Sequence, residues 1–160
     1  MIMSELSHFD ERGASRMVDT SQKPETLREA RASGLIRLAP ATVSLIRNRE
    51  LAKGDVFEVA RLAGIMAAKR TGDLIPLCHP LPITAVSIDF AFPSENTVQI
   101  EAAVRIFGRT GVEMEALTAV GVAALTVYDM CKSVDRAMTI ERIRLEAKSG
   151  GRSGTFKRAD

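Results

Sequence analysis

The sequence predicts an α+β fold in which helices are segregated on one side of an antiparallel sheet. Apolar residues alternate with other residues in two neighbouring segments, 83–92 and 98–104, and turn-forming residues 93–96 separate them, so we expect a β-hairpin. Two segments with helical spacing precede the hairpin, a longer one follows it, and strand-like segments lie near both ends. This order of elements is typical of one layered domain, and the chain has 160 residues, about one domain's length.

The first part of the chain leads into the sheet. Residues 1–14 are expected to form a flexible arm, and residues 16–19 a short strand. Residues 26–38 fit either a helix or a strand, but alternation in the second half of this segment favours a strand. Pro40 suits the first turn of a helix, which the spacing of apolar residues predicts over residues 41–49.

A second helix is expected to begin at Gly54 and Asp55 and to end near Gly72. One stripe of it is dominated by small residues, which let backbones approach closely, so we expect tight packing against another helix. The stripe consists of Val56, Val59, Ala60, Ala63 and Ala67. Three prolines then fall within residues 73–82, where they exclude helix and central strand, and the apolar character of this loop predicts that it is packed down.

The third helix is the longest and the most apolar. Thr110 stands three residues before Glu113, the spacing of a capping box, which predicts that the helix begins there. Within residues 116–131 the one charged residue is Asp129. A carboxylate in such a segment needs a partner, because an unpaired buried charge is very costly.

The chain ends with a short strand and a tail. Residues 140–145 alternate loosely and are expected to form the last strand. Residues 148–160 are rich in glycine and basic residues and are expected to form a flexible basic tail. Residues 15–147 then make up a single α+β domain.

Composition restricts the class of protein. Apolar residues make up 46% of the chain, and the net charge of +2 is too small to favour nucleic-acid binding, so a small anionic ligand is the better expectation. The two cysteines, Cys78 and Cys131, form no Cys-x-x-Cys pair and are expected to be reduced thiols. No secretory signal and no uncharged segment of membrane-spanning length is expected, which together predict a soluble cytoplasmic protein.

Asp129 and Lys132 are the first candidates for chemistry. They stand three residues apart, so they share a face of the helix. They form either a structural ion pair or a poised acid–base couple. Apolar surroundings raise the pKa of an aspartate and a lysine partner lowers it, so such a couple is able to exchange a proton near neutral pH.

His79 lies between prolines, on a stiff segment of backbone. Its imidazole either holds a phosphate or passes a proton, or else it hydrogen-bonds a neighbouring carbonyl, and the spacing leaves both interpretations open. A metal site at Cys78 and His79 is not expected, because adjacent residues rarely point at one ion and no other ligand cluster is evident.

Several charged residues at the ends of predicted elements are further candidates. The helix dipole favours acids in the first turn of the long helix, but Glu115 has no capping duty there, which makes it the better functional candidate of the two acids. Backbone donors of Thr110 and Gly111 are available to an anion at the helix start. The basic candidates are Arg28, Lys53 and Lys69.

Several strings of the sequence, in this order, resemble the MoaC-type family of cyclic pyranopterin monophosphate synthases, from about residue 7 to residue 158. They are Met17-Val-Asp19, Lys53-Gly-Asp-Val56, Ala63-Gly-Ile65, Ala67-Ala-Lys-Arg-Thr71, Asp73-Leu-Ile-Pro-Leu-Cys-His-Pro80, Thr110-Gly-Val-Glu-Met-Glu-Ala-Leu-Thr-Ala119, Tyr128-Asp-Met-Cys-Lys132 and Lys148-Ser-Gly-Gly.

The resemblance implies a ferredoxin-like fold, a homohexamer built as a trimer of dimers, and active sites between subunits. It implies a lyase of molybdenum cofactor biosynthesis that uses no cofactor. Its substrate is 3′,8-cyclo-7,8-dihydroguanosine 5′-triphosphate, which is rearranged to cyclic pyranopterin monophosphate with release of pyrophosphate. The domain at residues 15–147 is then the catalytic one.

The resemblance also assigns residues to roles. It implies that Asp129 is catalytic and that Lys132 is its partner. Arg152 stands where many members of the family have lysine, which keeps the charge but replaces an ammonium by a planar guanidinium. The implied substrate-binding residues are Leu77, Cys78, His79, Glu113, Met114 and Glu115, and the basic positions expected to meet the triphosphate are Lys53, Lys69 and Arg28.

Two other classes of function stay open at this point. A nucleotide-binding module would keep the pocket without turnover, and it would bind the cyclic triphosphate without releasing pyrophosphate. A purely structural subunit would need an apolar core but no converging cations, and the combination of Asp129, Lys132 and His79 argues against it.

Overall fold

The computed structural model describes residues 8–10 and 12–159. The five strands and four helices in this part of the chain are β1 (Thr26–Arg37), α1 (Pro40–Arg47), α2 (Val56–Lys69), α3 (Thr71–Leu74), β2 (Ala85–Ser94), β3 (Thr97–Gly108), α4 (Glu113–Cys131), β4 (Thr139–Ser149) and β5 (Phe156–Lys157).

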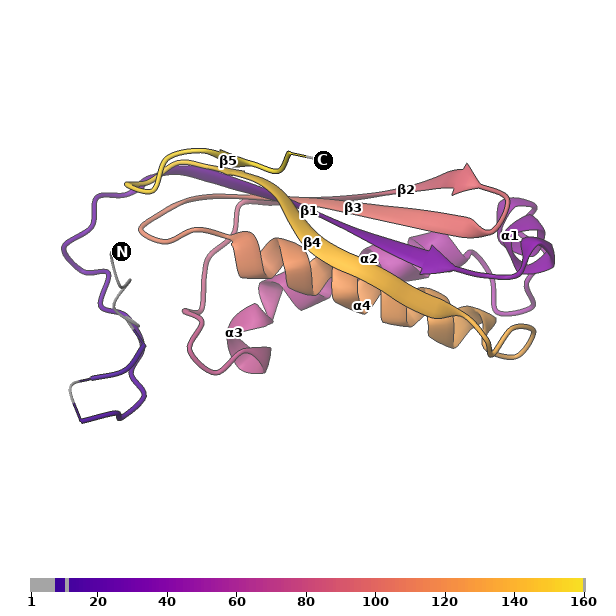
Figure 1. Cartoon of the computed structure of the whole chain (residues 1–160), viewed down its shortest axis with the longest axis horizontal. Coiled ribbons are helices and arrows are strands. Elements are labelled where there is room, and N and C mark those ends of the chain that lie inside the picture. Colours follow the sequence, from indigo (N-terminus) through magenta and orange to yellow (C-terminus); the bar gives the residue numbers. More distant parts are fainter. Residues whose placement is uncertain (1–7, 11, 160) are drawn as a thin grey trace.

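The strands form one antiparallel sheet in the order β2-β3-β1-β4-β5. The long helices α2 and α4 lie together on one face of it, and α1 lies at one end (Figure 1). The first four strands therefore have the strand order of a ferredoxin-like fold, which confirms the predicted α+β class.

Strand β1 resolves the ambiguity of residues 26–38. All twelve residues of β1 pair with β3, and most also pair with β4, so the whole segment is a central strand. Its helix-facing residues carry small or apolar side chains, with Gly34 opposite Val120 of α4. The exception is Arg28 at the start of the strand, whose position on this face buries a guanidinium near the beginning of α4.

Helices α2 and α4 pack closely, as the small residues of α2 predict. A Cβ added at Gly64 would lie 2.9 Å from the backbone oxygen of Ala119. The predicted stripe is wrong at two positions, because Val59 is 43% exposed and Ala63 is only half-buried. The buried face follows a spacing of about four residues and consists of Val56, Ala60, Gly64, Ala67 and Ala68.

The start of α4 differs from the predicted capping box. Val112 is the N-cap residue and no side chain caps the helix, so the pairing of Thr110 with Glu113 does not form. The Glu113 carboxylate instead folds back beside Gly111, where a Cβ would overlap it. The prediction failed because Glu113 has another partner, Lys148.

Two expectations for the N-terminal half are corrected. Residues 16–19 form no strand, and the short helix α3 occupies Thr71–Leu74, which includes the first two residues of the loop expected over 73–82. Of the expected arm, residues 1–7 and 11 lie outside the described residues. The remainder forms a turn in which Phe9 pairs with Ser15.

The C-terminal tail contributes to the sheet. Strand β4 runs on to Ser149, and β5 pairs with it through Phe156 and Lys157. The boundary expected at residue 147 therefore does not coincide with the end of the sheet. Glycines with positive φ, Gly150 at 92° and Gly151 at 74°, make the turn between the two strands.

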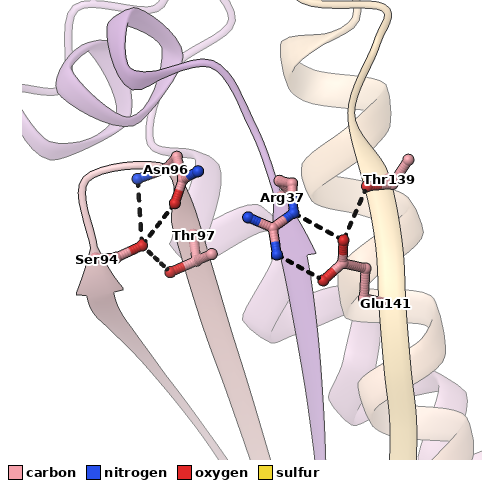
Figure 2. Close-up of polar contacts among 6 residues, drawn as sticks. All are labelled: Arg37, Ser94, Asn96, Thr97, Thr139 and Glu141. Atoms are coloured by element: carbon pink, nitrogen blue, oxygen red, sulfur yellow. Dashed lines mark hydrogen bonds and ion pairs between the residues drawn. The ribbon is translucent and has the colours of Figure 1, made fainter.

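Polar side-chain contacts lie at the end of the sheet near α1. Ser94 Oγ lies 2.6 Å from Thr97 Oγ1 in the β2–β3 turn, and Arg37 of β1 donates from Nε to Glu141 of β4 at 2.8 Å (Figure 2). These contacts hold the hairpin and the β1–β4 pair in register at this end, which lies away from the first turn of α4 (Figure 1).

In the described part of the chain, α4 is the one helix that is long and apolar enough to cross a membrane by composition. Its apolar residues pack against the sheet and α2, and nine of its nineteen residues are buried. Burial in the core accounts for its apolar composition.

Candidate functional site

A pocket of about 280 Å³ opens where the proline-rich loop meets the first turn of α4. Three segments distant in sequence form it: the N-terminal segment, the loop after α3 and the residues around the start of α4. We call it the Cys–His pocket. It is lined by His8, Val18, Thr20, Lys23, Leu77, Cys78, His79, Leu81, Thr110, Gly111, Glu113, Met114 and Glu115. All six non-basic residues expected to bind substrate are therefore brought together.

Glu115 is the buried acid of this pocket, with 3% of its surface exposed. Burial, with a smaller contribution from the nearby charge of Glu113, raises the pKa of its carboxyl to about 7. A carboxyl with this pKa carries a proton in part of the molecules at neutral pH, so it is able either to donate or to accept one.

Cys78 is half-buried beside Glu115, and burial together with the Glu115 charge raises the pKa of its thiol. The thiol is therefore protonated at neutral pH and is a poor nucleophile. Cys131 lies buried on α4, and both cysteines are free thiols, in accord with the prediction from their spacing.

The imidazole of His79 is held by the N-terminal segment, with its Nε2 2.8 Å from the backbone oxygen of Val18. This is the carbonyl contact that the sequence left open as an alternative. Because His79 also lines the Cys–His pocket, the carbonyl contact and a role in the pocket are compatible.

A second pocket, of about 220 Å³, continues from the first and shares Lys23, Thr110, Gly111 and Glu113 with it. We call it the basic pocket, because four cationic side chains line it. It is lined by Lys23, Arg28, Glu29, Arg109, Thr110, Gly111, Glu113, Lys148, Ser149, Gly150 and Ser153.

Arg28 is the most buried cation of the basic pocket, at 9% exposure. Its Nε donates to the carbonyl of Gly108 at 2.9 Å, and its Nη2 donates to that of Arg109 at 3.1 Å. These two carbonyls orient the guanidinium. None of the described carboxylates pairs with it, so its charge remains available to an anion.

Three of the four cations were not recognised as site residues from the sequence. Lys148 Nζ lies 3.5 Å from Glu113 Oε1 and also contacts Ser153 Oγ, which links β4 and the following turn to α4. Arg109 donates from Nη1 to the carbonyl of Ser21 at 3.3 Å. The Lys-Ser-Gly-Gly string was a signal for Lys148, whereas Lys23 and Arg109 had no motif of their own.

The expected catalytic pair lies at the other end of α4. Lys132 Nζ donates to Asp129 Oδ1 at 2.6 Å. Lys53 Nζ donates to the Asp129 backbone oxygen at 2.8 Å and lies 3.9 Å from its Oδ2. One carboxylate is thus held between two ammonium groups, which we call the Asp129 cluster.

The surroundings of this cluster differ from the apolar ones expected. The side chain of Asp129 is 60% exposed and that of Lys132 is 52% exposed. The hydrogen bond from Lys132 lowers the pKa of the Asp129 carboxyl, and the same bond raises the pKa of the Lys132 ammonium. In the single chain the two groups form an ion pair, and the expected proton exchange near neutral pH is not supported. The expected apolar surroundings are absent in the single chain because Asp129 projects from the exposed side of α4.

The two groups of residues are widely separated within one chain. Glu115 and Asp129 are fourteen residues apart on α4, or about 21 Å along the helix axis at 1.5 Å per residue. Side chains do not bridge this distance. One chain therefore presents two partial sites at opposite ends of one helix.

The remaining basic candidate, Lys69, is exposed on the last turn of α2 and lines neither pocket. Within the described ranges, no three His, Cys, Asp or Glu side chains lie close enough together to hold a metal ion.

Comparison with known proteins gives a consistent result. The sequence pattern of the MoaC family matches residues 17–151. The chain is similar to the cyclic pyranopterin monophosphate synthase of Thermomicrobium roseum, with 62% identity over 159 residues, 99% of this chain and 96% of that protein. It is 62% identical over 154 residues to cyclic pyranopterin monophosphate synthase 1 of Mycobacterium tuberculosis, 96% of this chain and 91% of that one. For the synthase of Parvibaculum lavamentivorans the identity is 59% over 158 residues, 98% and 99% of the two chains.

Proposed function

The chain belongs to the MoaC family, and on that premise we propose that it is a cyclic pyranopterin monophosphate synthase, a lyase of molybdenum cofactor biosynthesis. It converts 3′,8-cyclo-7,8-dihydroguanosine 5′-triphosphate to cyclic pyranopterin monophosphate and pyrophosphate. The observation that carries the proposal is the joining of a pocket with a buried acid to a pocket with four cations at the first turn of α4.

The basic pocket suits a triphosphate. Arg28 is fixed by two carbonyls and has a forked donor set, while Lys148 supplies a compact charge beside the start of α4. Cations around a leaving pyrophosphate offset the charge that develops on it as its bond to the nucleoside phosphate breaks. Lys23 and Arg109 complete the set.

The Cys–His pocket suits the ring system. Ring opening and reclosing on a pterin precursor require proton transfers rather than electron transfer. Glu115, whose raised pKa leaves a proton on part of the molecules at neutral pH, is suited to transfer one, and the His79 ring supplies a nitrogen donor or acceptor in the same pocket. Leu77, Met114 and Cys78 provide the less polar wall against which the ring lies.

Asp129 and Lys132 take part from a second subunit. An ion pair exposed in one chain loses water when a partner covers it, and a carboxylate and an ammonium then exchange a proton more readily. We assign them the proton transfers of the rearrangement, with Lys53 holding the pair in place. The assembly is a homohexamer, a trimer of dimers, and it has no nucleic-acid partner and no membrane partner. It works in the cytoplasm, where the free thiols Cys78 and Cys131 stay reduced.

The first test is turnover. Purified protein incubated with the cyclic triphosphate is expected to release pyrophosphate, and Lys132→Ala is expected to abolish release while its circular dichroism spectrum and unfolding midpoint stay those of the parent. Tight binding without pyrophosphate would favour the nucleotide-binding module instead. Full turnover by Lys132→Ala would remove this lysine from the mechanism.

The second test addresses the shared site. His79→Ala and Lys132→Ala chains are each expected to be inactive. Co-refolding them in equal amounts should restore about one quarter of the sites. An active site needs an intact His79 from one chain and an intact Lys132 from its partner, and each is present in half of the chains. Mixed assembly is verified by mass spectrometry of the intact oligomer. If mixed oligomers form and remain inactive, the Cys–His pocket of one subunit does not meet the Asp129 cluster of another.

A further inference from the structure

The N-terminal segment at residues 16–23, which we call the strap, lies along the Cys–His pocket. Val18, Thr20 and Lys23 all line that pocket, and Lys23 lines the basic pocket as well. The strap contains no helix or strand, so what keeps it in place is a small set of specific hydrogen bonds.

The strap makes one contact with chemical consequences. The backbone oxygen of Val18 lies 2.8 Å from His79 Nε2. A carbonyl oxygen only accepts hydrogen bonds, so the ring nitrogen that faces it must carry the proton. The neutral imidazole then has its lone pair on Nδ1, and Nδ1 is the nitrogen left to accept a proton from a ligand.

The strap is held by its own turn and by the body of the protein. Asp19 Oδ1 accepts a hydrogen bond from the Ser21 amide at 2.8 Å, and the Lys23 amide donates to the Thr20 carbonyl at 3.0 Å. Hydrogen bonds from Ser21 lower the pKa of the Asp19 carboxyl, so it is ionised at neutral pH. Arg109, which lines the basic pocket, donates to the Ser21 carbonyl and lies 3.7 Å from Glu25 Oε1.

We propose that the strap is a positioning element of the site, in which Asp19 fixes the turn that lets the Val18 carbonyl hold His79 in its Nε2–H form. The proposal rests on the proposed function for the identity of the reaction, but the geometry concerns the unliganded protein. Asp19 acts through the backbone and through His79, so it is a positioning residue rather than a catalytic one.

The sequence offers closely matched variants. Asp19→Ala removes the side-chain acceptor of the turn, whereas Asp19→Asn keeps an oxygen in the same place. Asp10 makes the same kind of turn, with Oδ1 accepting from the amides of Arg12 and Ala14 at 2.9 Å each, but it does not line the Cys–His pocket. Asp10→Ala is therefore the control for losing such a turn elsewhere in the N-terminal segment.

The direct measurement is the tautomer of His79. The ¹⁵N chemical shifts of its ring nitrogens are recorded without substrate at alkaline pH, where an imidazole is neutral, and its signals are assigned by their absence in His79→Gln. We expect the Nε2–H tautomer in the parent, Asp19→Asn and Asp10→Ala, and a mixture of tautomers in Asp19→Ala. An Nδ1–H tautomer in the parent overturns the proposal, and this result does not depend on whether any variant folds. An unchanged tautomer in Asp19→Ala overturns it as well.

The kinetic measurement separates positioning from binding. Asp19→Ala is expected to lower kcat by about 10-fold to 100-fold with little change in KM, because His79 is misoriented rather than removed. Asp19→Asn is expected to recover most of this loss. Unchanged kcat in Asp19→Ala overturns the proposal. Absence of turnover in the parent overturns the proposed function instead, since the tautomer is read without any reaction.

Discussion

The position of Glu115 in the fold changes the chemistry of its carboxyl. An acid in the first turn of a helix is usually explained by the helix dipole. In this protein the side chain turns inward and is buried, which raises the pKa of its carboxyl from the ordinary 4.5 to about 7. A carboxyl group whose pKa is raised in the folded protein lowers the free energy of unfolding when it is ionised.

The sign of this effect gives a prediction. Between pH 4.5 and about 7 the folded protein keeps a proton on Glu115 that the unfolded chain has lost, so the free energy of unfolding falls as the pH rises and the full cost is present above 7. Glu115→Gln removes this cost. Relative to the parent it should gain about 2–3 kcal/mol of stability between about pH 4 and pH 8.

The measurement is urea denaturation of both proteins across that pH range. Glu50→Gln, at an exposed position after α1, is the matched control for replacing a glutamate by glutamine. A difference between Glu115→Gln and the parent that is independent of pH would mean that the carboxyl does not hold its proton in the folded state.

At this scale the sequence identified some of the residues that the fold brings to the pockets, but not all of them. It favoured Glu115 over Glu113 because a capping box was expected to occupy Glu113, but that capping box does not form and Glu113 pairs with Lys148 instead. It could not place Arg109 or Lys23, because a lone basic residue has no pattern until the fold brings it to a pocket. The expected apolar surroundings of Asp129 were wrong for the single chain, because an uncharged segment does not reveal which side of the helix is exposed.

At the scale of elements, the pair α2 and α4 depends on small residues. In an exposed helix Gly→Ala is stabilising by about 1 kcal/mol, because alanine has the higher helix propensity. At Gly64 the added methyl would lie 2.9 Å from the Ala119 oxygen and 3.3 Å from the Ala123 Cβ, neither of which is the end of a flexible side chain.

Gly64→Ala is therefore expected to destabilise the protein by about 1–3 kcal/mol, because overpacking outweighs the gain in helix propensity. Chemical denaturation gives the value. The neighbouring substitution Ala63→Gly in the same turn supplies the helix-propensity contribution on its own, which is expected to be a loss of about 1 kcal/mol. If Gly64→Ala stabilises the protein, α2 and α4 are free to move apart.

Elements with strong periodicity were predicted correctly, and those decided by long-range contacts were not. The hairpin and the three main helices follow from spacing of apolar residues within each segment. The first half of β1 has no such pattern, and becomes a strand because β3 and β4 pair with it on both sides. Strand β5 is two residues long and exists only through β4, so nothing local announces it.

At the scale of the whole molecule, the length of α4 separates the two groups of candidate residues, so the proposed function needs a second chain to bring them together. The Cys–His pocket and the Asp129 cluster lie at its two ends, about 21 Å apart along the helix axis. A two-fold axis crossing α4 near Val122 would place each end beside the opposite end of the partner's helix. One such dimer then contains two complete sites, related by symmetry.

This arrangement predicts that the exposed apolar residue near the middle of α4 is covered in the dimer. Leu125 is 60% exposed in the single chain and lies one turn from Val122. Leu125→Lys is expected to dissociate the assembly into folded chains and to abolish pyrophosphate release, because a buried unpaired ammonium is strongly unfavourable. Leu125→Met keeps the side chain apolar and similar in size, so its assembly and turnover should match those of the parent. Sedimentation velocity reports the mass, with 17.4 kDa expected for a single chain, and circular dichroism reports folding. A Leu125→Lys protein that stays oligomeric and active would exclude α4 as the helix through which the two halves of the site meet.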